Sequence, residues 1–410
     1  MAAPAPSPAV VPTPGAELRA HFPALAGSDD VPLDNAATTH RPAAVIDAVT
    51  RFYAESNANV HRAVHRLGIA ATAAYEGSRA RVARFLQAET DEVVFSRNAT
   101  DAINLVARGF VEPRVKQGDA IVVTALEHHS NLVPWQQVAR RTGARLEVLA
   151  VDDRGLLALP ATLPPDTAFV AATRVSNALG TIVDTSALVD LAHRAGVPVL
   201  LDVTQAVGHL PLDEGTLAAD FLALSAHKMY GPMGLGVLRG KAARLAETEP
   251  VTFGGEMVDS VSDQAATWAE VPLRFEAGTP AVAPASAFPP ALDLLEGVGI
   301  AAVRAHEKAL LERLLTGLAG IDGCRVVGPE GADGRSGSVS MAIAGGDVHT
   351  AATVLDLSGI AVRAGWHCAE PLLRRMGQGP TLRASLAAYN TADDIDRLLD
   401  ALPDAIAASA

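Results

Sequence analysis

Two residues that follow apolar runs of this chain could form a reactive site together. Lys228 lies in the segment 225–234, directly after the apolar run 221–224, and Asp202 closes the apolar run 197–201. Ligands of α/β proteins bind beyond the carboxyl ends of parallel strands, so we expect both side chains at that edge of a sheet. A desolvated lysine amine there is a good nucleophile toward a carbonyl carbon, although a lone loop lysine is most often a surface residue.

Asp202 adds chemistry that favours an aldehyde cofactor. A carboxylate at a buried strand end is costly unless it meets a cation or hydrogen-bond donors. The pyridinium nitrogen of pyridoxal phosphate is such a cation, and an aspartate that keeps it protonated makes the ring an electron sink. Gln205 follows closely and could reach the phenolic oxygen of the ring. Asp202 could instead only cap the turn after its strand, but together with Lys228 it favours the cofactor.

A phosphate group needs donors, and an expected strand-to-helix turn at Asn98, Ala99 and Thr100 offers them. Backbone N–H groups at such a turn, together with the Thr100 hydroxyl, could bind an anion. Ser225 and His227, close to Lys228 in the sequence, could donate from the opposite side. Without the other site residues, the pattern would indicate only an ordinary helix N-cap.

The segment 127–131 brings histidines to the end of the expected strand 120–124. The imidazole of His128 could stack on the cofactor ring and transfer protons near pH 7. His61 and His65 also have a spacing that can hold a metal ion, but no third-ligand pattern such as H-E-x-x-H accompanies them. We therefore expect no metal site.

The segment 363–371 places a cysteine, Cys368, in a loop after an expected strand, with Arg363 and His367 nearby. Positive neighbours and partial exposure favour a reactive thiolate, whereas a lone cysteine is more often an inert core residue. The second cysteine, Cys324, lies within an apolar strand and fits that inert role. Arg383 lies further along the chain, and its guanidinium group is suited to bidentate binding of a substrate carboxylate.

The elements that must position these residues alternate between strand and helix. We predict strands at 91–96, 120–124, 146–150, 169–172 and 197–202, and helices at 98–107 and 186–195. Near-continuous apolar strands between helices indicate a mostly parallel sheet covered on both faces. Residues 35–290 are therefore expected to form a large, doubly wound α/β domain.

The expected pattern of helices and strands changes after residue 290, and residues 291–410 are expected to form a small α+β domain. We predict one long helix at 291–318, strands at 324–327, 337–343 and 360–363, and helices at 348–358 and from 392, capped by Thr391. Residues 1–16 are rich in alanine and proline and predict a flexible tail. Residues 17–34 are expected to form an N-terminal segment that packs with the small domain.

Composition excludes several classes of protein. Two cysteines in 410 residues exclude a disulfide scaffold and indicate a reducing compartment, which we expect to be the cytoplasm. A formal net charge of −13 argues against a general nucleic-acid binder, and 4% aromatic residues make base-stacking platforms unexpected. The N-terminus has no basic region before an apolar one, and no run reaches the ~18 apolar residues of a membrane span. We therefore expect no membrane partner.

Taken together, the motifs resemble those of the fold type I, class V aminotransferase-like enzymes that use pyridoxal phosphate. More narrowly, the chain is similar to group II cysteine desulfurases and to the related selenocysteine lyases. The resemblance runs from about residue 33 to the C-terminus. It rests on the motifs LDNAATT, ANVHRAVHRL, RNATDAINLVA, EHHSNLVPWQ, RVSNALGT, LLDVTQAV, LSAHKMYGPMGLG, FGGEM, RFEAGTP, RAGWHCAEP and RASLAAYNT. It implies a large domain with a mostly parallel sheet of the seven-stranded type and a small C-terminal domain.

The resemblance implies how the cofactor and the substrate are held. Lys228 would bond to the cofactor, Asp202 would pair with its ring nitrogen, Gln205 would meet its phenolic oxygen, and His128 would stack on the ring. The phosphate would be held by Asn98, Ala99, Thr100, Ser225 and His227. Thr279 would reach the phosphate of a neighbouring subunit, which implies a homodimer. The substrate would be held by Asn177, Arg383 and His367.

The implied reaction converts L-cysteine to L-alanine and leaves a persulfide on Cys368, which passes to a sulfur-acceptor protein. One alternative is a selenocysteine lyase acting on L-selenocysteine, or another C–S lyase of the same fold. Another is a non-catalytic scaffold that docks through its tail, against which the full set of cofactor residues argues. Two positions depart from the family pattern: Trp366 stands where a histidine is common, and Ala99 lacks a common hydroxyl.

Overall fold

A computed structural model describes residues 12–410 and contains a central sheet of seven strands. The strand order is β2-β8-β7-β6-β5-β3-β4. The strands are β2 (Val93–Ser96), β3 (Ala120–Thr124), β4 (Arg145–Leu149), β5 (Thr167–Thr173), β6 (Val199–Asp202), β7 (Phe221–Ser225) and β8 (Gly236–Gly240). β8 alone runs in the opposite direction to the other six strands. The expected large domain with a mostly parallel, seven-stranded sheet is confirmed.

Alternate residues of the inner strands face opposite layers of helices. In β5, Val170 and Ala172 belong to one hydrophobic cluster, whereas Phe169 and Ala171 belong to the other. All four side chains are buried, which explains why the strand reads as a continuous apolar run. The first cluster includes residues of α3 (Arg66–Phe85), α6 (Thr185–Arg194) and α10 (Pro289–Val298), and the second includes residues of α4 (Ala99–Leu105) and α5 (Val133–Thr142).

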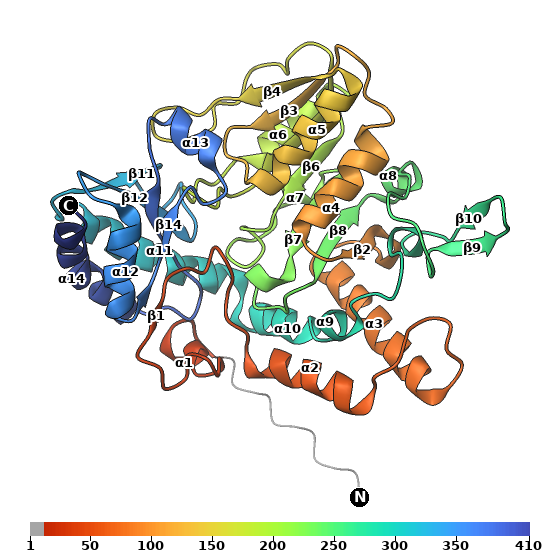
Figure 1. Ribbon diagram of the computed structural model, residues 1–410, viewed down its shortest axis with the longest axis horizontal. Coiled ribbons are helices and arrows are strands. Elements are labelled where there is room, and N and C mark those ends of the chain that lie inside the picture. The colour runs from red at the N-terminus through yellow and green to blue at the C-terminus, as the bar shows by residue number, and fades with distance from the viewer. Residues whose placement is uncertain (1–11) are drawn as a thin grey trace, which may run out of the picture.

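Shorter elements complete the large domain. They are α2 (Ala43–Glu55), α7 (Glu214–Leu217), α8 (Ala242–Ala246) and α9 (Val282–Ser286), and the hairpin of β9 (Val258–Val261) and β10 (Ala266–Trp268). The π-helical turn Val106–Val111 follows α4 directly, so the helix expected at 98–107 changes its pitch at its end. Figure 1 shows the hairpin projecting from the side of the molecule opposite α14.

The small domain is built on a four-stranded antiparallel sheet in the order β11-β12-β15-β14. Its strands are β11 (Cys324–Val327), β12 (Ser338–Ile343), β14 (Arg363–Gly365) and β15 (Thr381–Ser385). Its helices are α11 (Ile300–Leu318), α12 (Val348–Leu357), α13 (Glu370–Arg375) and α14 (Ala392–Ser409). The helix expected from residue 392 is present, and Thr391 caps it in a reciprocal pair with Asp394.

Two of the expected elements are wrong in detail. The single helix expected at 291–318 is two helices, α10 and α11, which are broken at Gly299 with a positive φ of 84°. Leu292 and Leu295 of α10 pack in the core of the large domain, whereas Leu311 and Leu314 of α11 pack in the core of the small one. The strand expected at 360–363 is likewise divided into β13 (Ile360–Ala361) and β14, because the two halves pair with different partners.

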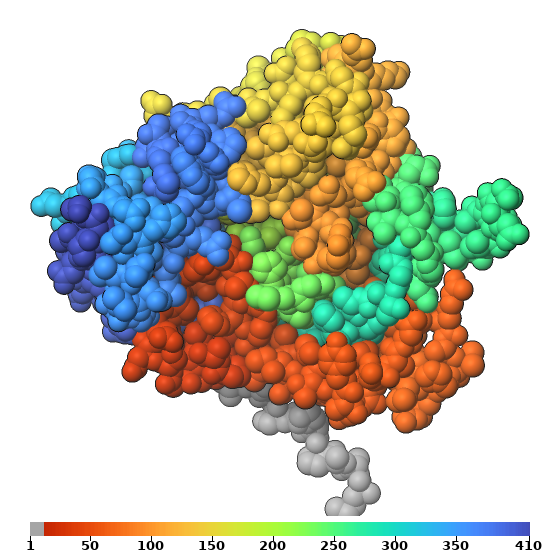
Figure 2. Space-filling view, in the orientation of Figure 1, coloured from red at the N-terminus to blue at the C-terminus, as the bar shows by residue number. Residues whose placement is uncertain are grey.

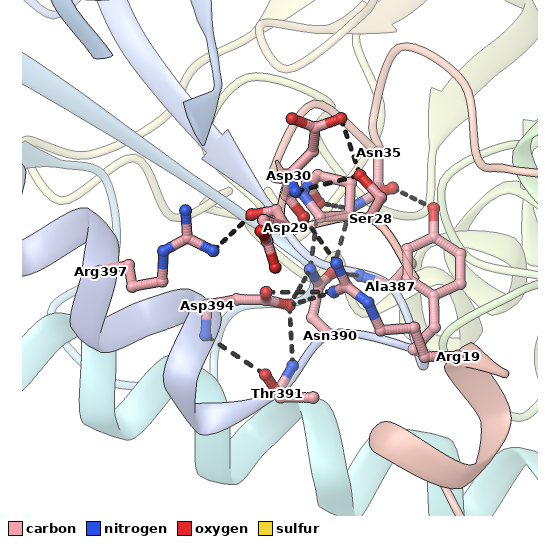
Figure 3. Close-up of polar contacts among 12 residues, drawn as sticks. Arg19, Ser28, Asp29, Asp30, Asn35, Ala387, Asn390, Thr391, Asp394 and Arg397 are labelled. Carbon is pink, nitrogen blue, oxygen red and sulfur yellow. Dashed lines mark hydrogen bonds and ion pairs between the residues drawn. The ribbon is translucent and has the colours of Figure 1, made fainter. Parts of the chain in front are cut away.

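The N-terminal segment is fastened to the last helix of the small domain (Figure 3). Arg19, at the end of α1 (Ala16–Arg19), pairs with buried Asp394 at 3.1 Å, and Asn390 links Asp394 to Asn35. The pairing of β1 (Val31–Pro32) with β13 adds backbone bonds. The expected flexible tail falls mostly in residues 1–11, outside the described residues. Within its remainder Gly15 already donates to the Ala388 carbonyl, so the packed chain begins before residue 17.

A buried pair joins the two domains beside the site. His209 Nδ1 lies 2.9 Å from Glu307 Oε1 of α11, and both side chains are almost fully buried. Burial opposes the charged imidazole, but the Glu307 carboxylate outweighs it and raises the pKa of His209. Because neither group has access to water, each depends on the other for a partner.

Among the described residues, no single helix is both long and apolar enough to cross a membrane. The helical stretches 282–298 and 300–318 are long and apolar enough only when they are taken together, and the chain bends by 73° between them.

Candidate active site

A cavity of about 270 Å³ opens where six segments of the chain meet. Its walls come from residues 36–37, 98–100, 128–130, 173–177, 202–228 and 363–383. In Figure 2 these segments surround a hollow, with the blue C-terminal residues on one side and the orange and yellow segments on the other. The cavity lies beyond the carboxyl ends of β5, β6 and β7, which is where the sequence predicts a site.

Asp202 and Lys228 reach the cavity because their strands end side by side. Asp202 is the last residue of β6, and Lys228 ends the short 3₁₀ turn that follows β7. Burial raises the pKa of Asp202, although the backbone N–H of Thr204 and the nearby lysine favour its charged form. Burial lowers the pKa of Lys228 to about 8, so a substantial fraction of this amine is neutral at mildly alkaline pH.

His128 enters the cavity from the turn after β3 as a neutral imidazole. Its Nδ1 accepts the backbone N–H of Ser130 at 3.0 Å, so the ring proton is on Nε2. Burial, followed by the charge of Lys228, lowers the pKa of His128 to about 3. Neighbouring Glu127 is buried and bonded to Thr124 and Asn131, which fixes the start of this turn.

The expected phosphate turn also lines the cavity. Asn98 caps α4, the N–H of Ala99 donates to Ser225 Oγ at 2.8 Å, and Thr100 Oγ1 shares a hydrogen bond with Ser130 Oγ at 2.7 Å. A Cβ at Gly236 in β8 would lie 2.3 Å from the Asn98 backbone, so only glycine lets this turn approach the sheet.

His227 lines the cavity beside the same turn. Its pKa is lowered to about 4 by burial, so this imidazole is neutral as well. Its Nδ1 contacts Thr38 Oγ1 at 3.2 Å, which orients the ring.

The loop of Cys368 closes the cavity from the small domain. The residue is exposed, and it follows β14 as expected. His367 and Cys368 both have positive φ angles, 51° and 54°, which non-glycine residues rarely adopt. The Cys368 carbonyl accepts the backbone N–H of His129 at 2.8 Å, and the His367 carbonyl accepts Asn177 Nδ2 at 2.6 Å. The strained loop is therefore held by contacts with the large domain.

Arg383 of β15 forms the floor of the cavity near this loop. Its Nη1 donates to the Asn177 carbonyl at 3.0 Å, and its Nη2 donates to Asp34 at 2.8 Å. The side chain is almost fully buried. His367 contacts Thr381 through Nε2 at 2.9 Å, and burial lowers its pKa to about 3. Asn177, Arg383 and His367, the three expected substrate residues, thus lie together.

One expected site residue is not in the cavity. Thr279 lines a separate hollow of this chain together with Tyr75, Phe95 and Glu276. The sequence analysis also missed several lining residues, namely Ala36, Ala37, Ser130, Thr173, Val175 and Thr204. Ser130 could have been found, because it lies in the motif that pointed to His128. Ala36, Ala37, Val175 and Thr204 also lie within motifs quoted above, and only Thr173 lies outside them.

No group of three or more metal-ligating side chains occurs among the described residues. His61 and His65 precede α3 rather than lying on it. His61 contacts Glu76 at 2.8 Å, and His65 accepts the N–H of Gly68, so both rings have protein partners. Cys324 is half-buried, and burial raises the pKa of its thiol to about 11.

The donor set of the cavity fits pyridoxal phosphate. Four buried polar atoms of its lining have no hydrogen-bond partner within the described chain: Asn177 Oδ1, Thr204 Oγ1, His367 Nδ1 and Arg383 Nε. Asp202 forms no ion pair among the described residues, which leaves its carboxylate available to a ring nitrogen, and Lys228 supplies an amine of lowered pKa. This fold and this donor set define a fold type I enzyme dependent on pyridoxal phosphate.

Comparison with known proteins narrows the class. Residues 31–398 match the family model "Aminotransferase class-V". A "probable cysteine desulfurase" of Halalkalibacterium halodurans is 45% identical over 394 residues, which cover 94% of this chain and 96% of that protein. The chain therefore belongs to the class-V aminotransferase family and, within it, to the cysteine desulfurases. It spans only 57% to 63% of the length of three other relatives, from two mycobacterial species and a cyanobacterium.

Solved structures agree with this assignment. The cysteine desulfurase CsdA from Escherichia coli superimposes with a TM-score of 0.88 and 38% identity, covering 96% of this chain and 98% of that one. The apo cysteine desulfurase from Thermococcus onnurineus NA1 gives a TM-score of 0.90 and 35% identity, covering 95% and 98%. The cofactor of this chain is accordingly pyridoxal phosphate.

Proposed function

We propose that this protein is a cysteine desulfurase that converts L-cysteine to L-alanine and passes the sulfur on through Cys368. The observation that carries the proposal is the position of the Cys368 thiol, in the same cavity as Lys228, Asp202 and Arg383. Enzymes of this fold that break a C–S bond without an enzyme thiol need residues such as Lys228, Asp202 and Arg383, but they do not need this cysteine. The 41% to 45% identity to proteins named cysteine desulfurase supports the same reaction.

The residues divide the work by position. Arg383 would hold the α-carboxylate of the substrate, because its buried Nε has no partner among the described residues. With the cofactor bound, Asp202 would pair with the ring nitrogen, Gln205 with the phenolic oxygen, and His128 would stack on the ring. The turn of Asn98, Ala99 and Thr100, with Ser225 and His227, would hold the phosphate. When bound, the cofactor supplies an electron sink for the negative charge that develops at the substrate α-carbon.

Lys228 moves the protons of the reaction. With a pKa near 8, its Nζ can take the α-proton of the substrate as a neutral amine and return a proton as an ammonium group. The Cys368 thiolate then attacks the substrate sulfur, so that one S–S bond forms and the C–S bond breaks. The carbon retains the electron pair, gains a proton and leaves as L-alanine. Cys368 keeps the sulfur as a persulfide.

Substrate choice and the role of Cys368 can be tested together. We expect the enzyme to release alanine from L-cysteine, and Cys368→Ser to abolish that release while L-selenocysteine is still cleaved. Full release from L-cysteine by Cys368→Ser would instead indicate a C–S lyase. Turnover of L-selenocysteine alone would indicate a selenocysteine lyase.

We also propose a sulfur-acceptor protein as partner, because the persulfide must leave by attack of a second thiolate. The cytoplasm is the compartment that suits this cycle, since Cys368 must stay reduced between turnovers. Release of alanine should therefore speed up when a thiol acceptor is added, and a stoichiometric burst should be seen without one.

A homodimer in which Thr279 completes the neighbouring site would explain why this residue lies outside the cavity of its own chain. Mixing two impaired variants, Lys228→Ala and Thr279→Ala, tests this arrangement. A mixed dimer has one site with both native residues if Thr279 acts across the interface, so activity should exceed that of either variant. Activity that only averages the two variants would place Thr279 within its own subunit.

A further inference from the structure

The carboxylate of Asp34 bridges both arginines of the cavity. Arg383 Nη2 donates to Asp34 Oδ1 at 2.8 Å, and Arg363 Nε donates to Asp34 Oδ2 at 3.1 Å. Each carboxylate oxygen thus serves one guanidinium group. Asp34 does not line the cavity itself, although both arginines do.

The register of the small sheet explains the need for this carboxylate. Arg363 of β14 and Arg383 of β15 are directly opposite residues of an antiparallel pair. Like charges in that position destabilise a sheet, and Arg383 is buried in addition. An isolated bridge to Ser385 fixes residue 34 beside β15, within reach of both guanidinium groups.

The three residues therefore carry one net positive charge: two arginines minus one aspartate. A single substrate carboxylate neutralises that charge, and the thiol of cysteine adds none. A second carboxylate on the substrate side chain would add a negative charge beside a group of three residues that the first carboxylate has already neutralised. Arg383 still has its Nε–H free for the first carboxylate, so Asp34 does not block substrate binding.

We propose that Asp34 is a specificity-determining residue, which limits the site to amino acids with one carboxylate. This inference rests on the proposed function, because it takes an α-amino acid as the substrate. Repulsion between unit charges across a protein cavity, at an effective dielectric constant of ~20, changes an affinity by about tenfold.

Calorimetric titration of the holoenzyme with L-alanine and with L-aspartate tests the proposal. The quantity of interest is the ratio of the two dissociation constants, because it cancels effects on the shared α-carboxylate. In Asp34→Asn, which keeps the shape of the side chain, the preference for L-alanine should fall by about tenfold. Asp30→Asn is the matched control, because the Asp30 carboxylate contacts Ser28 and neither arginine.

Arg363→Gln supplies a second, opposite test that does not depend on the folding of the Asp34 variant. Its side chain is 44% exposed, and its removal leaves no net positive charge, so the preference for L-alanine should rise. A ratio that stays within about twofold of the native value in every folded variant would overturn the proposal. Failure of L-cysteine turnover in the native enzyme would instead overturn the proposed function. The ratios of the two dissociation constants could still be measured in that case.

Discussion

The side-chain amide of Asn177 donates to the backbone carbonyl of His367 at 2.6 Å, across the boundary between the two domains. Asn177 belongs to the large domain and His367 to the loop of the proposed nucleophile. The backbone carbonyl of the same Asn177 accepts a hydrogen bond from Arg383. One residue therefore joins Arg383, the proposed carboxylate-binding arginine, to the position of the Cys368 loop.

Asn177→Ala should loosen that loop, because two consecutive residues with positive φ lose a support. We expect faster amide hydrogen exchange at Ala369 and at His129, whose N–H donates to Cys368. The kcat for L-cysteine should fall by roughly 10-fold to 100-fold, since the thiol is less well placed. Asn57→Ala, at an exposed position, is the control. Unchanged exchange in the loop would show that Asn177 does not hold it.

The lowered pKa of Lys228 predicts an unusual reactivity in the cofactor-free protein. Only the neutral amine reacts with an acetylating reagent, so labelling of Lys228 should rise through a midpoint of about pH 8. Half-buried Lys308, whose pKa is raised by the Asp333 carboxylate, should react only at higher pH. Peptide mass analysis after labelling at several pH values measures both. Labelling of Lys228 at the same pH as Lys308 would contradict the desolvated site.

Asp202→Asn should remove the charge that supports the ring nitrogen while it keeps the shape of the side chain. Loss of one preorganised electrostatic partner typically costs about 100-fold or more in kcat. The cofactor content should change less, because the phosphate turn and Lys228 remain. Asp190→Asn, on the exposed side of α6, serves as the control in steady-state assays. A kcat near the native value would exclude the proposed role of Asp202.

The motifs predicted this neighbourhood well because they fall at strand ends. Asp202, Lys228 and the turn at 98–100 follow apolar runs, and parallel strands bring their carboxyl ends to one edge. Asp34 could not be assigned in this way, because its partners Arg363 and Arg383 lie more than 300 positions away in the sequence. The register of β14 and β15 brings the two arginines together, and the bridge of residue 34 to Ser385 adds Asp34.

The boundaries of some helices and strands were less predictable from the sequence for a related reason. The apolar pattern of residues 291–318 is continuous, so it gives no sign that α10 and α11 pack in different cores. The closely spaced Gly297 and Gly299 are the local signal of the break. The prediction of one strand at 360–363 was wrong for a similar reason. Tertiary partners, and not β-propensity, decide which sheet each half of this segment joins.

The buried pair of His209 and Glu307 predicts a large effect on stability. Glu307→Gln leaves the imidazole without its counter-charge, which should lower the free energy of unfolding by about 3 kcal/mol. The double variant His209→Asn with Glu307→Gln should recover part of this loss, since neither group is then charged. Denaturant unfolding of the holoenzyme measures all three proteins.

The same pair predicts the direction of a pH dependence. The pKa of His209 is higher in the folded chain than in the unfolded one. The contribution of the pair is therefore complete below about pH 6.5 and is lost as the pH rises through the folded pKa. The difference in stability between the native protein and the double variant should shrink over that range. A difference that grows with pH would contradict the raised pKa.

The mass of the peptide that contains Cys368, measured after a single turnover of L-cysteine without an acceptor, tests the central claim most directly. We predict that this peptide gains one sulfur atom, that a thiol reductant removes it, and that the peptide of Cys324 is unchanged. An unmodified Cys368 after stoichiometric release of alanine would contradict the account, because the sulfur would then have left without passing through this thiol.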